Sequence, residues 1–318
     1  MRRSDERRHS ERVRRNTRNN RIHLCPRTPG PNEHKNTMTT PMLRWVFCFS
    51  FPLACLAQTS LHTLITYNIR YDGPTDLCET WQERKGPISQ QIRDSKAGIV
   101  GLQEVLSHQL DDLLELLPSY RSVGVGREDG LRGGEFVPIF YDTTRYTVVQ
   151  EGTFWLSSTP SVPSRGWDAA LNRICTYALF QAKAEAVFFW VLNVHFDHRG
   201  KVARQESISL VMDKYLECRQ WTNAPVLIVG DFNMEPLDPG ISRMKNRFID
   251  FSCPAPGREE CNPPTFNAFT LDSTDDKCID YVFGSPGLSL KKSRRIIDPF
   301  GMSYPSDHFP LLFRFSLP

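Results

Sequence analysis

Apolar runs that end abruptly in polar side chains are the main pattern of this chain. Residues 226–229 form an uncharged apolar run that continues through Gly230 into Asp231, Phe232 and Asn233. Such a run is typical of a strand buried on both faces of a sheet. We therefore predict a central strand that presents an acid and an amide at the rim of a sheet.

The same pattern recurs along the chain. Other apolar runs end in or carry a polar residue at Asn68, Glu104, His195 and Asp280, and a further pair, Asp307 and His308, lies near the C-terminus. An ordinary protein core has no use for so many carboxylates at strand ends. We therefore expect a hydrophilic, metal-compatible cleft at one edge of a sheet.

Helical spacing appears between these runs. Leucines at helical intervals follow Ser107 and stop at Pro118, which predicts a helix capped by Ser107. Residues 88–99 and 203–221 are predicted to be helical as well. Strands are predicted at residues 137–141, 146–149, 174–182 and 187–194. Many strands with helices at intervals favour an α/β fold, a four-layered sandwich of two packed mixed β-sheets flanked by helices.

The N-terminal part differs from the rest. Residues 1–41 are basic and poor in apolar side chains, so we expect a disordered segment, most simply one outside the working protein. A nucleic-acid-binding tail and a mitochondrial presequence are the alternatives. Residues 42–57 are typical of a secretory signal that is cleaved after Ala57, with a membrane anchor or a buried helix as the alternatives. Residues 58–318 are expected to form one domain.

These features predict a secreted protein without stable membrane association after signal cleavage. A signal-anchored or cytoplasmic protein is the alternative if translation starts at Met1. Six cysteines follow Ala57, and Cys253 with Cys261 is the preferred disulfide pair because both flank a loop rich in Pro and Gly. No C-x-x-C sequence is present, which argues against a structural zinc site.

Charge narrows the choice of partners. The net charge of the chain is +3, but residues 1–57 hold 12 of the 39 Lys and Arg and 4 of the 36 acidic residues. The remaining 27 basic and 32 acidic residues make the body of the chain mildly acidic. An acidic body gains little from attraction to phosphate backbones, which disfavours a broad nucleic-acid groove. No obligate protein partner is indicated.

The polar residue types indicate a class of chemistry. Carboxylate and amide oxygens suit Mg²⁺, with Mn²⁺ as the alternative, and Mg²⁺ often bridges to substrate phosphate. The H-E-x-x-H pattern of zinc hydrolases and the G-x-S-x-G pattern of serine hydrolases are absent. The two histidines beside acids provide groups that can titrate near neutral pH. A metal, a base and an acid together favour attack of water on a phosphate ester.

The ordered motifs resemble those of the endonuclease/exonuclease/phosphatase superfamily over roughly Leu61 to Phe315. They are Thr66-Tyr67-Asn68, Leu102-Gln103-Glu104, Asn193-Val194-His195, Gly230-Asp231-Phe232-Asn233, Ile279-Asp280-Tyr281 and Ser306-Asp307-His308. The resemblance implies that residues 58–318 form the catalytic domain of such an enzyme. The general style of the sequence is most similar to the group beside the nocturnin-like deadenylases.

The resemblance also implies roles for individual residues. Glu104, Asn68 and Asp307 would hold the metal. Asp231 would orient or deprotonate the attacking water, and Asn233 would contact the phosphate. The remaining implied roles are phosphate stabilisation or general base for His308, ring support for Asp280, and phosphate contact or leaving-group assistance for His195.

Two further residues are candidates from the sequence itself. Arg173 could bind two phosphate oxygens through its guanidinium, and Asp197 shares a strand face with His195, where contact with metal or substrate competes with loop solvation. The preferred function is a phosphodiesterase or nuclease, similar to a 3′-5′ exoribonuclease acting on RNA or a nucleotide. The alternatives are a phosphomonoesterase for a small nucleotide, sugar or inositol phosphate, and a non-catalytic binding module.

Overall fold

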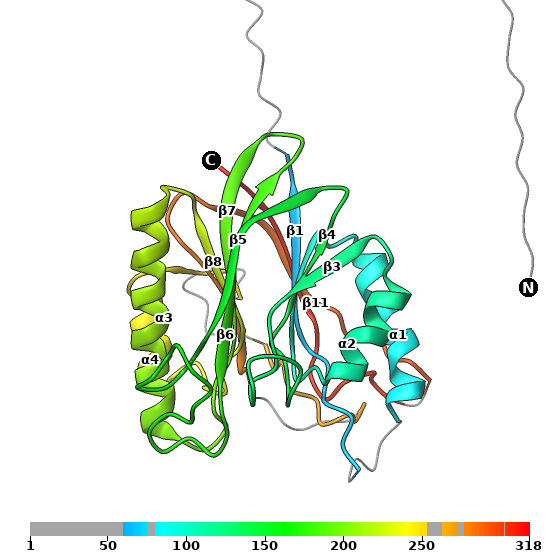
Figure 1. Ribbon diagram of the computed structural model, residues 1–318. Helices are drawn as coiled ribbons and strands as arrows, with labels where there is room; N and C mark the ends of the chain where they lie inside the picture. The colour runs from blue at the N-terminus through cyan, green and yellow to red at the C-terminus, as the bar shows by residue number, and fades with distance from the viewer. Residues whose placement is uncertain (1–59, 75–79, 253–262, 272–276, 302) are drawn as a thin grey trace, which may run out of the picture. The chain divides into compact units, whose positions relative to one another are not determined.

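Two six-stranded sheets form the centre of the structure, as Figure 1 shows. This computed structural model describes residues 60–74, 80–252, 263–271, 277–301 and 303–318. The helices are α1 (Trp81–Ser95), α2 (Ser107–Leu116), α3 (Lys201–Trp221) and α4 (Pro239–Lys245). The strands are β1 (His62–Asn68), β2 (Ile99–Gln103), β3 (Tyr120–Val123), β4 (Ile139–Asp142), β5 (Tyr146–Trp155), β6 (Ile174–Ala182), β7 (Val187–His195), β8 (Val226–Asp231), β9 (Ile249–Asp250), β10 (Asp280–Gly284), β11 (Ser289–Arg295) and β12 (Leu311–Ser316).

Both sheets are mixed. The first has the strand order β11-β12-β1-β2-β4-β3 and the second the order β5-β6-β7-β8-β10-β9. Only the pairs β1–β2 and β7–β8 are parallel among the paired strands of the described residues. The parallel pairs lie at the centre of each sheet, where both faces are covered. The predicted fold class is therefore confirmed.

Alternation of side chains along the central strands builds the four layers. In β1, Leu64 packs in the cluster between the two sheets, together with Val229 of β8. Its neighbour Ile65 points to the opposite face and packs with Ile88 of α1 and Leu113 of α2. Helices α3 and α4 cover the outer face of the second sheet, as α1 and α2 cover the first (Figure 1). Because every central strand is buried on both faces, its apolar run is continuous.

Several predicted boundaries were wrong. Helix α1 spans Trp81–Ser95, and Ile99, which was predicted to be helical, begins strand β2. Pro87 lies inside this helix, although proline usually ends one. For that reason the first two turns of α1 were not predicted. Ser107 is the first residue of α2 rather than its cap, and Gln109 Oε1 instead accepts from the backbone N–H of Leu106 at 3.0 Å.

Other predictions fall outside the described residues. The segments 1–41 and 42–57 and the Cys253–Cys261 pair are among these. Among the described cysteines, Cys175, Cys218 and Cys278 are free thiols in buried positions. None of the described helices has the length and apolar character needed to cross a membrane.

One glycine permits the close pairing of β7 and β8 at the polar edge. Gly230 has φ 137°, and a Cβ atom at this position would lie 2.0 Å from the carbonyl oxygen of Val194. The next residue is Asp231, so the backbone that carries this acid is held directly against β7. A side chain at position 230 would push the two strands apart.

We expect Gly230→Ala to lower the free energy of unfolding by about 3 kcal/mol, because it combines a steric clash with backbone strain. Gly287→Ala is the matched control, since Gly287 has φ 101° but no atom within 4 Å of an added Cβ. The control should lose about 1 kcal/mol. Urea unfolding of the three proteins measures both values, and equal losses would contradict the close-approach argument.

Candidate active site

The sheet topology brings the predicted polar residues to one edge. Strands β1, β2, β7 and β8 end at this edge, because each parallel pair runs in the same direction. Strands β10 and β12 begin there, because they run antiparallel to β8 and β1. Asn68, His195 and Asp231 therefore lie at strand ends, Glu104 follows β2, and Asp280 opens β10.

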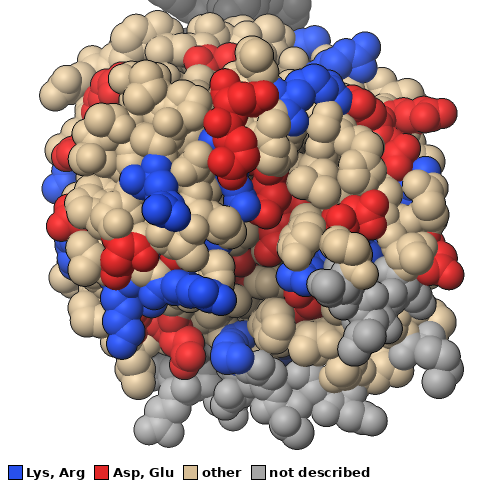
Figure 2. All heavy atoms as spheres, turned by 60° about the horizontal axis from the view of Figure 1, so that its bottom comes forward, with Lys and Arg blue, Asp and Glu red and all other residues tan. Residues whose placement is uncertain are grey.

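A cavity of about 620 Å³ opens between the two sheets at this edge. Figure 2 shows acidic side chains gathered in the hollow of this face, with basic side chains around it. Residues from both sheets and from several loops line the cavity: Arg70, Tyr71, Glu104, Arg127, Glu135, Leu171, Arg173, His195, His198, Asp231, Asn233, Phe266, Ile279, Asp307 and His308. The predicted residues Asn68, Asp197 and Asp280 are not among them and lie behind the wall of the cavity.

Asn68 joins the two sheets beneath the cavity. Its amide nitrogen Nδ2 donates to Glu104 Oε1 at 3.0 Å and to Asp231 Oδ2 at 3.1 Å. Its Oδ1 accepts from the backbone N–H of Arg70 at 3.0 Å, and the side chain is fully buried. Asn68 therefore positions two carboxylates through its nitrogen, and its predicted role as a metal ligand stays a prediction, since Oδ1 accepts one hydrogen bond and keeps a second lone pair.

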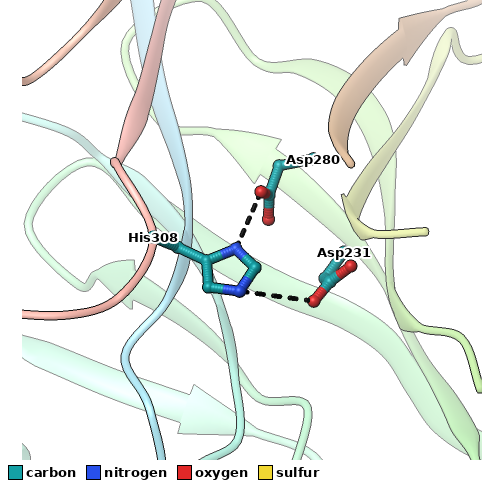
Figure 3. A group of neighbouring side chains, drawn as sticks. All are labelled: Asp231, Asp280 and His308. Atoms are coloured by element: carbon teal, nitrogen blue, oxygen red, sulfur yellow. Dashed lines mark hydrogen bonds and ion pairs between the residues drawn. The ribbon is translucent and has the colours of Figure 1, made fainter. Parts of the chain in front are cut away.

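Asp231, His308 and Asp280 form a chain of contacts, shown in Figure 3. His308 Nδ1 lies 2.9 Å from Asp280 Oδ2, and His308 Nε2 lies 3.9 Å from Asp231 Oδ2. Burial alone would lower the pKa of His308, but Asp280, Asp307 and Asp231 raise it to about 10. These carboxylates therefore favour the imidazolium form of the ring.

Asp231 differs from an ordinary surface acid. Burial, together with the charge of Asp280, raises the pKa of Asp231 to about 7, although His308 opposes the shift. Its second oxygen, Oδ1, accepts from the backbone N–H of Asn233 at 2.8 Å. Asn233 has φ 50°, which turns the chain back directly after β8. A carboxyl with such a pKa can exchange a proton with water near neutral pH.

His195 lies on the other side of Asp231. Its Nε2 is 3.7 Å from Asp231 Oδ2 and its Nδ1 is 3.9 Å from Glu135 Oε2. Burial and the charges of Arg173 and Arg127 lower the pKa of His195 well below its usual value, so the ring is neutral at physiological pH. Its Nδ1 has no hydrogen-bond partner among the described residues.

Arg173 is buried rather than solvated on the surface. Its Nε donates to Asp197 Oδ2 at 3.3 Å, and its Nη2 lies 3.1 Å from His198 Nδ1. Its Nη1 has no partner among the described residues, although the side chain is only 4% exposed. A buried guanidinium nitrogen without an acceptor fits the predicted role in binding phosphate oxygens.

Asp197 supports Arg173 and does not face the cavity. Besides the guanidinium, its carboxylate accepts from the backbone N–H groups of Gly200 at 2.7 Å, Arg199 at 2.9 Å and Leu171 at 3.3 Å. From strand alternation, Asp197 was predicted to share a face with His195. In the structure both carboxylate oxygens of Asp197 already accept hydrogen bonds from the protein. In this structure Asp197 therefore positions Arg173, and its predicted contact with substrate stays a prediction.

Arg70 is a cavity residue that the sequence analysis missed. Its Nη1 lies 3.8 Å from Glu104 Oε2 and 3.9 Å from Asp307 Oδ2. Arg127 was missed as well; it also lines the cavity, and its Nη1 donates to Glu135 Oε2 at 2.7 Å. The position of Arg70 two residues after Asn68 was a usable signal, whereas Arg127 sits in a glycine-rich loop whose conformation no local pattern specifies.

Comparison with known proteins agrees with this geometry. Residues 65–308 match the Endonuclease/Exonuclease/phosphatase family. The chain belongs to this family. Its homologues are metal-dependent phosphoesterases, phosphatases and nucleases among them, so the prediction of a metal-dependent phosphoesterase is confirmed.

Individual relatives in the family span several kinds of protein. The structure of a mannosyl-6-phosphatase from Bacteroides thetaiotaomicron is 36% identical, covers 80% of this chain and 100% of its own, and superposes with a TM-score of 0.76. An uncharacterized protein of Acanthamoeba polyphaga mimivirus is 27% identical over 49% of this chain, and Drosophila melanogaster nocturnin is 22% identical over 75%. The chain spans 60% and 42% of the lengths of these last two relatives.

The cavity carboxylates fit a divalent cation. Burial raises the pKa of Asp307 to about 6, and Glu104 adds to the shift against the opposing charge of His308. Ligand atoms of Asp231, Asp280 and His308 also lie within 4.8 Å of one another. In that group, however, His308 Nδ1 already binds Asp280. Glu104 and Asp307, whose oxygens approach the same Arg70 nitrogen, are therefore the better metal-ligand candidates in this family member, since oxygen ligands suit Mg²⁺.

We expect 5 mM Mg²⁺ to raise the melting temperature of the chelator-treated protein by about 5 °C, because a ligand at a hundred times its Kd stabilises by about 2.7 kcal/mol. Glu104→Gln should lose most of this shift because it removes one anionic ligand. Glu115→Gln, on the exposed side of α2, is the control and should keep it. An unchanged shift in Glu104→Gln would place the metal elsewhere.

Proposed function

We propose that this phosphoesterase is a divalent-metal-dependent phosphomonoesterase that acts on a small phosphate ester, with a sugar phosphate as the preferred class. The observation that carries the proposal is the contact chain from Asp280 through His308 to Asp231, whose last two residues line the same cavity as the buried Arg173. Asp231 as the base, His308 as a cation and Arg173 as the phosphate-binding group thus line one cavity whose volume suits a single small ligand.

Each of these residues has a distinct role in hydrolysis. Asp231, held by Asn68 and the backbone of Asn233, accepts a proton from the attacking water. The carboxylates around His308 raise its pKa and favour the imidazolium form, so we assign it the stabilisation of negative charge that develops on the phosphate oxygens. A metal bound near Glu104 would act as a Lewis acid toward a phosphate oxygen. Arg173 orients the phosphate through its guanidinium.

Two observations favour a small monoester over a polynucleotide. The body of the chain has more acidic than basic residues, and the cavity wall carries four carboxylates against three arginines: Glu104, Glu135, Asp231 and Asp307 against Arg70, Arg127 and Arg173. A polynucleotide would need a longer basic track. The mannosyl-6-phosphatase structure matches over its full length at 36% identity, which supports a sugar phosphate. The nuclease interpretation remains the second candidate, supported by the nocturnin match.

A substrate panel tests the proposal. With Mg²⁺, the full chain should release phosphate from mannose 6-phosphate with a kcat/KM at least tenfold above its value for bis-p-nitrophenyl phosphate or an oligoribonucleotide. His308→Gln should lower kcat by 10²–10³ through loss of charge stabilisation, while Glu115→Gln stays near wild type. A preference for the oligoribonucleotide would support the nuclease, and failure to hydrolyse any ester would support a binding module.

Secretion is a separate proposal that rests on residues 42–57. The apolar run and the small residues before Gln58 support cleavage after Ala57. Expression in a secreting host followed by N-terminal sequencing should find a protein in the medium that starts at Gln58. A retained protein that starts at Met1 would contradict secretion.

A further inference from the structure

A second cavity of about 500 Å³ adjoins the active-site cavity. The two share His198, Asn233, Phe266 and Ile279 as lining residues. Phe266 also contacts the ring of His308 edge-on, with 5.2 Å between ring centroids. A phosphate ester whose phosphorus lies beside His308 can therefore extend past Phe266 into the second cavity without leaving the protein surface.

Different elements supply the far wall of this cavity. Arg204 comes from the first turn of α3, Asp238 is the N-cap residue of α4, and Glu235 lies in the turn between β8 and α4. Lys277 lies over the ring of Phe266, with 5.5 Å between its Nζ and the ring centroid. None of these residues has a part in the hydrolytic arrangement described above.

Among the described residues that line the second cavity, the cations Arg204 and Lys277 match the acids Glu235 and Asp238 in number. Burial together with Arg173 lowers the pKa of His198, which favours a neutral ring. A subsite for a second phosphate would carry excess positive charge. A subsite for hydroxyl groups needs both donors and acceptors, and a balanced set supplies both.

Asp238 offers an unused acceptor on the wall, beside a fixed cation. The cation is Arg204, which is 9% exposed and whose Nη1 donates to the carbonyl oxygen of Asp197 at 2.8 Å. Asp238 Oδ1 accepts from Gly240 N and from Gln205 Nε2, each at 2.8 Å. Its Oδ2 has no hydrogen bond within the part of the chain that the structure describes, and so remains an acceptor. Phe266 offers an apolar ring face beside these groups.

We propose that the second cavity is the leaving-group subsite and that it binds a neutral polyhydroxy group, the sugar of a sugar phosphate. This inference rests on the proposed phosphomonoesterase function and adds where the sugar is recognised. In the reaction, the water oxygen bonds to phosphorus while the ester P–O bond breaks. The sugar keeps the ester oxygen and gains one proton, and inorganic phosphate is the other product.

The test removes the two acidic acceptors without removing the helix cap. In the double variant Glu235→Gln with Asp238→Asn, asparagine still caps α4, so the fold should persist. We expect kcat/KM for mannose 6-phosphate to fall at least tenfold, because hydrogen bonds from sugar hydroxyls to carboxylates are charge-assisted. The kcat/KM for phenyl phosphate, which has no hydroxyl groups on its leaving group, should change less than twofold.

Glu206→Gln, an exposed position on the same helix as Arg204, is the matched control and should leave both substrates unchanged. Equal changes for the two substrates in the double variant, or no change in either, would overturn the subsite. So would a wild-type preference for an inositol polyphosphate over mannose 6-phosphate.

Calorimetric binding of mannose 6-phosphate separates this inference from the proposed function. If the wild type hydrolyses no monoester, the proposed function fails. The subsite is still supported if the double variant binds at least tenfold more weakly than the wild type. Equal binding by the two proteins overturns it.

Discussion

The constraint on which this structure depends is the burial of several carboxylates at the seam between two sheets. Like charges repel most strongly where water is excluded. Asn68 reduces the cost by donating to Glu104 of its own sheet and to Asp231 of the other sheet. The compensation is incomplete, because the pKa values of Asp231 and Asp307 stay raised. A cation at this seam would relieve the remaining repulsion, which couples the stability of the edge to its chemistry.

The sheets must approach closely for this seam to exist. A Cβ atom on Gly101 of β2 would lie 2.9 Å from Val229 and 3.0 Å from Asn193 of the facing sheet. Beneath the site, Gln103 Nε2 donates to Asn193 Oδ1 at 2.7 Å, and Asn193 Nδ2 donates to the carbonyl oxygens of Leu102 and Pro138. These buried amides are fixed across the seam, so they hold the edge residues at set distances.

The strand-end residues could be predicted from the sequence because apolar runs mark buried strands and their last residues reach an edge. The alternation of side chains along a strand predicts on which face of the sheet a residue lies, but not whether its side chain reaches the cavity or stays buried behind the cavity wall. Asn68 and Asp197 therefore looked like cavity residues, although both lie behind the wall. Phe266 could not be predicted, since it reaches His308 through a loop contact distant in sequence. The predicted helix began too late, at Ile88, because proline usually interrupts a helix. In the structure Pro87 lies inside α1, where the packing of Ile88 and Ile92 outweighs the unfavourable effect of proline on the helix.

Hydrolysis in water enriched in ¹⁸O tests the central claim most directly, because the arrangement of Asp231 and His308 requires water to attack phosphorus. With Mg²⁺ and mannose 6-phosphate, the full chain should release phosphate that carries one ¹⁸O atom and mannose that carries none from the solvent. Chelation of the metal should abolish release. Label in the sugar, or release that persists at the same rate after chelation, would contradict the account.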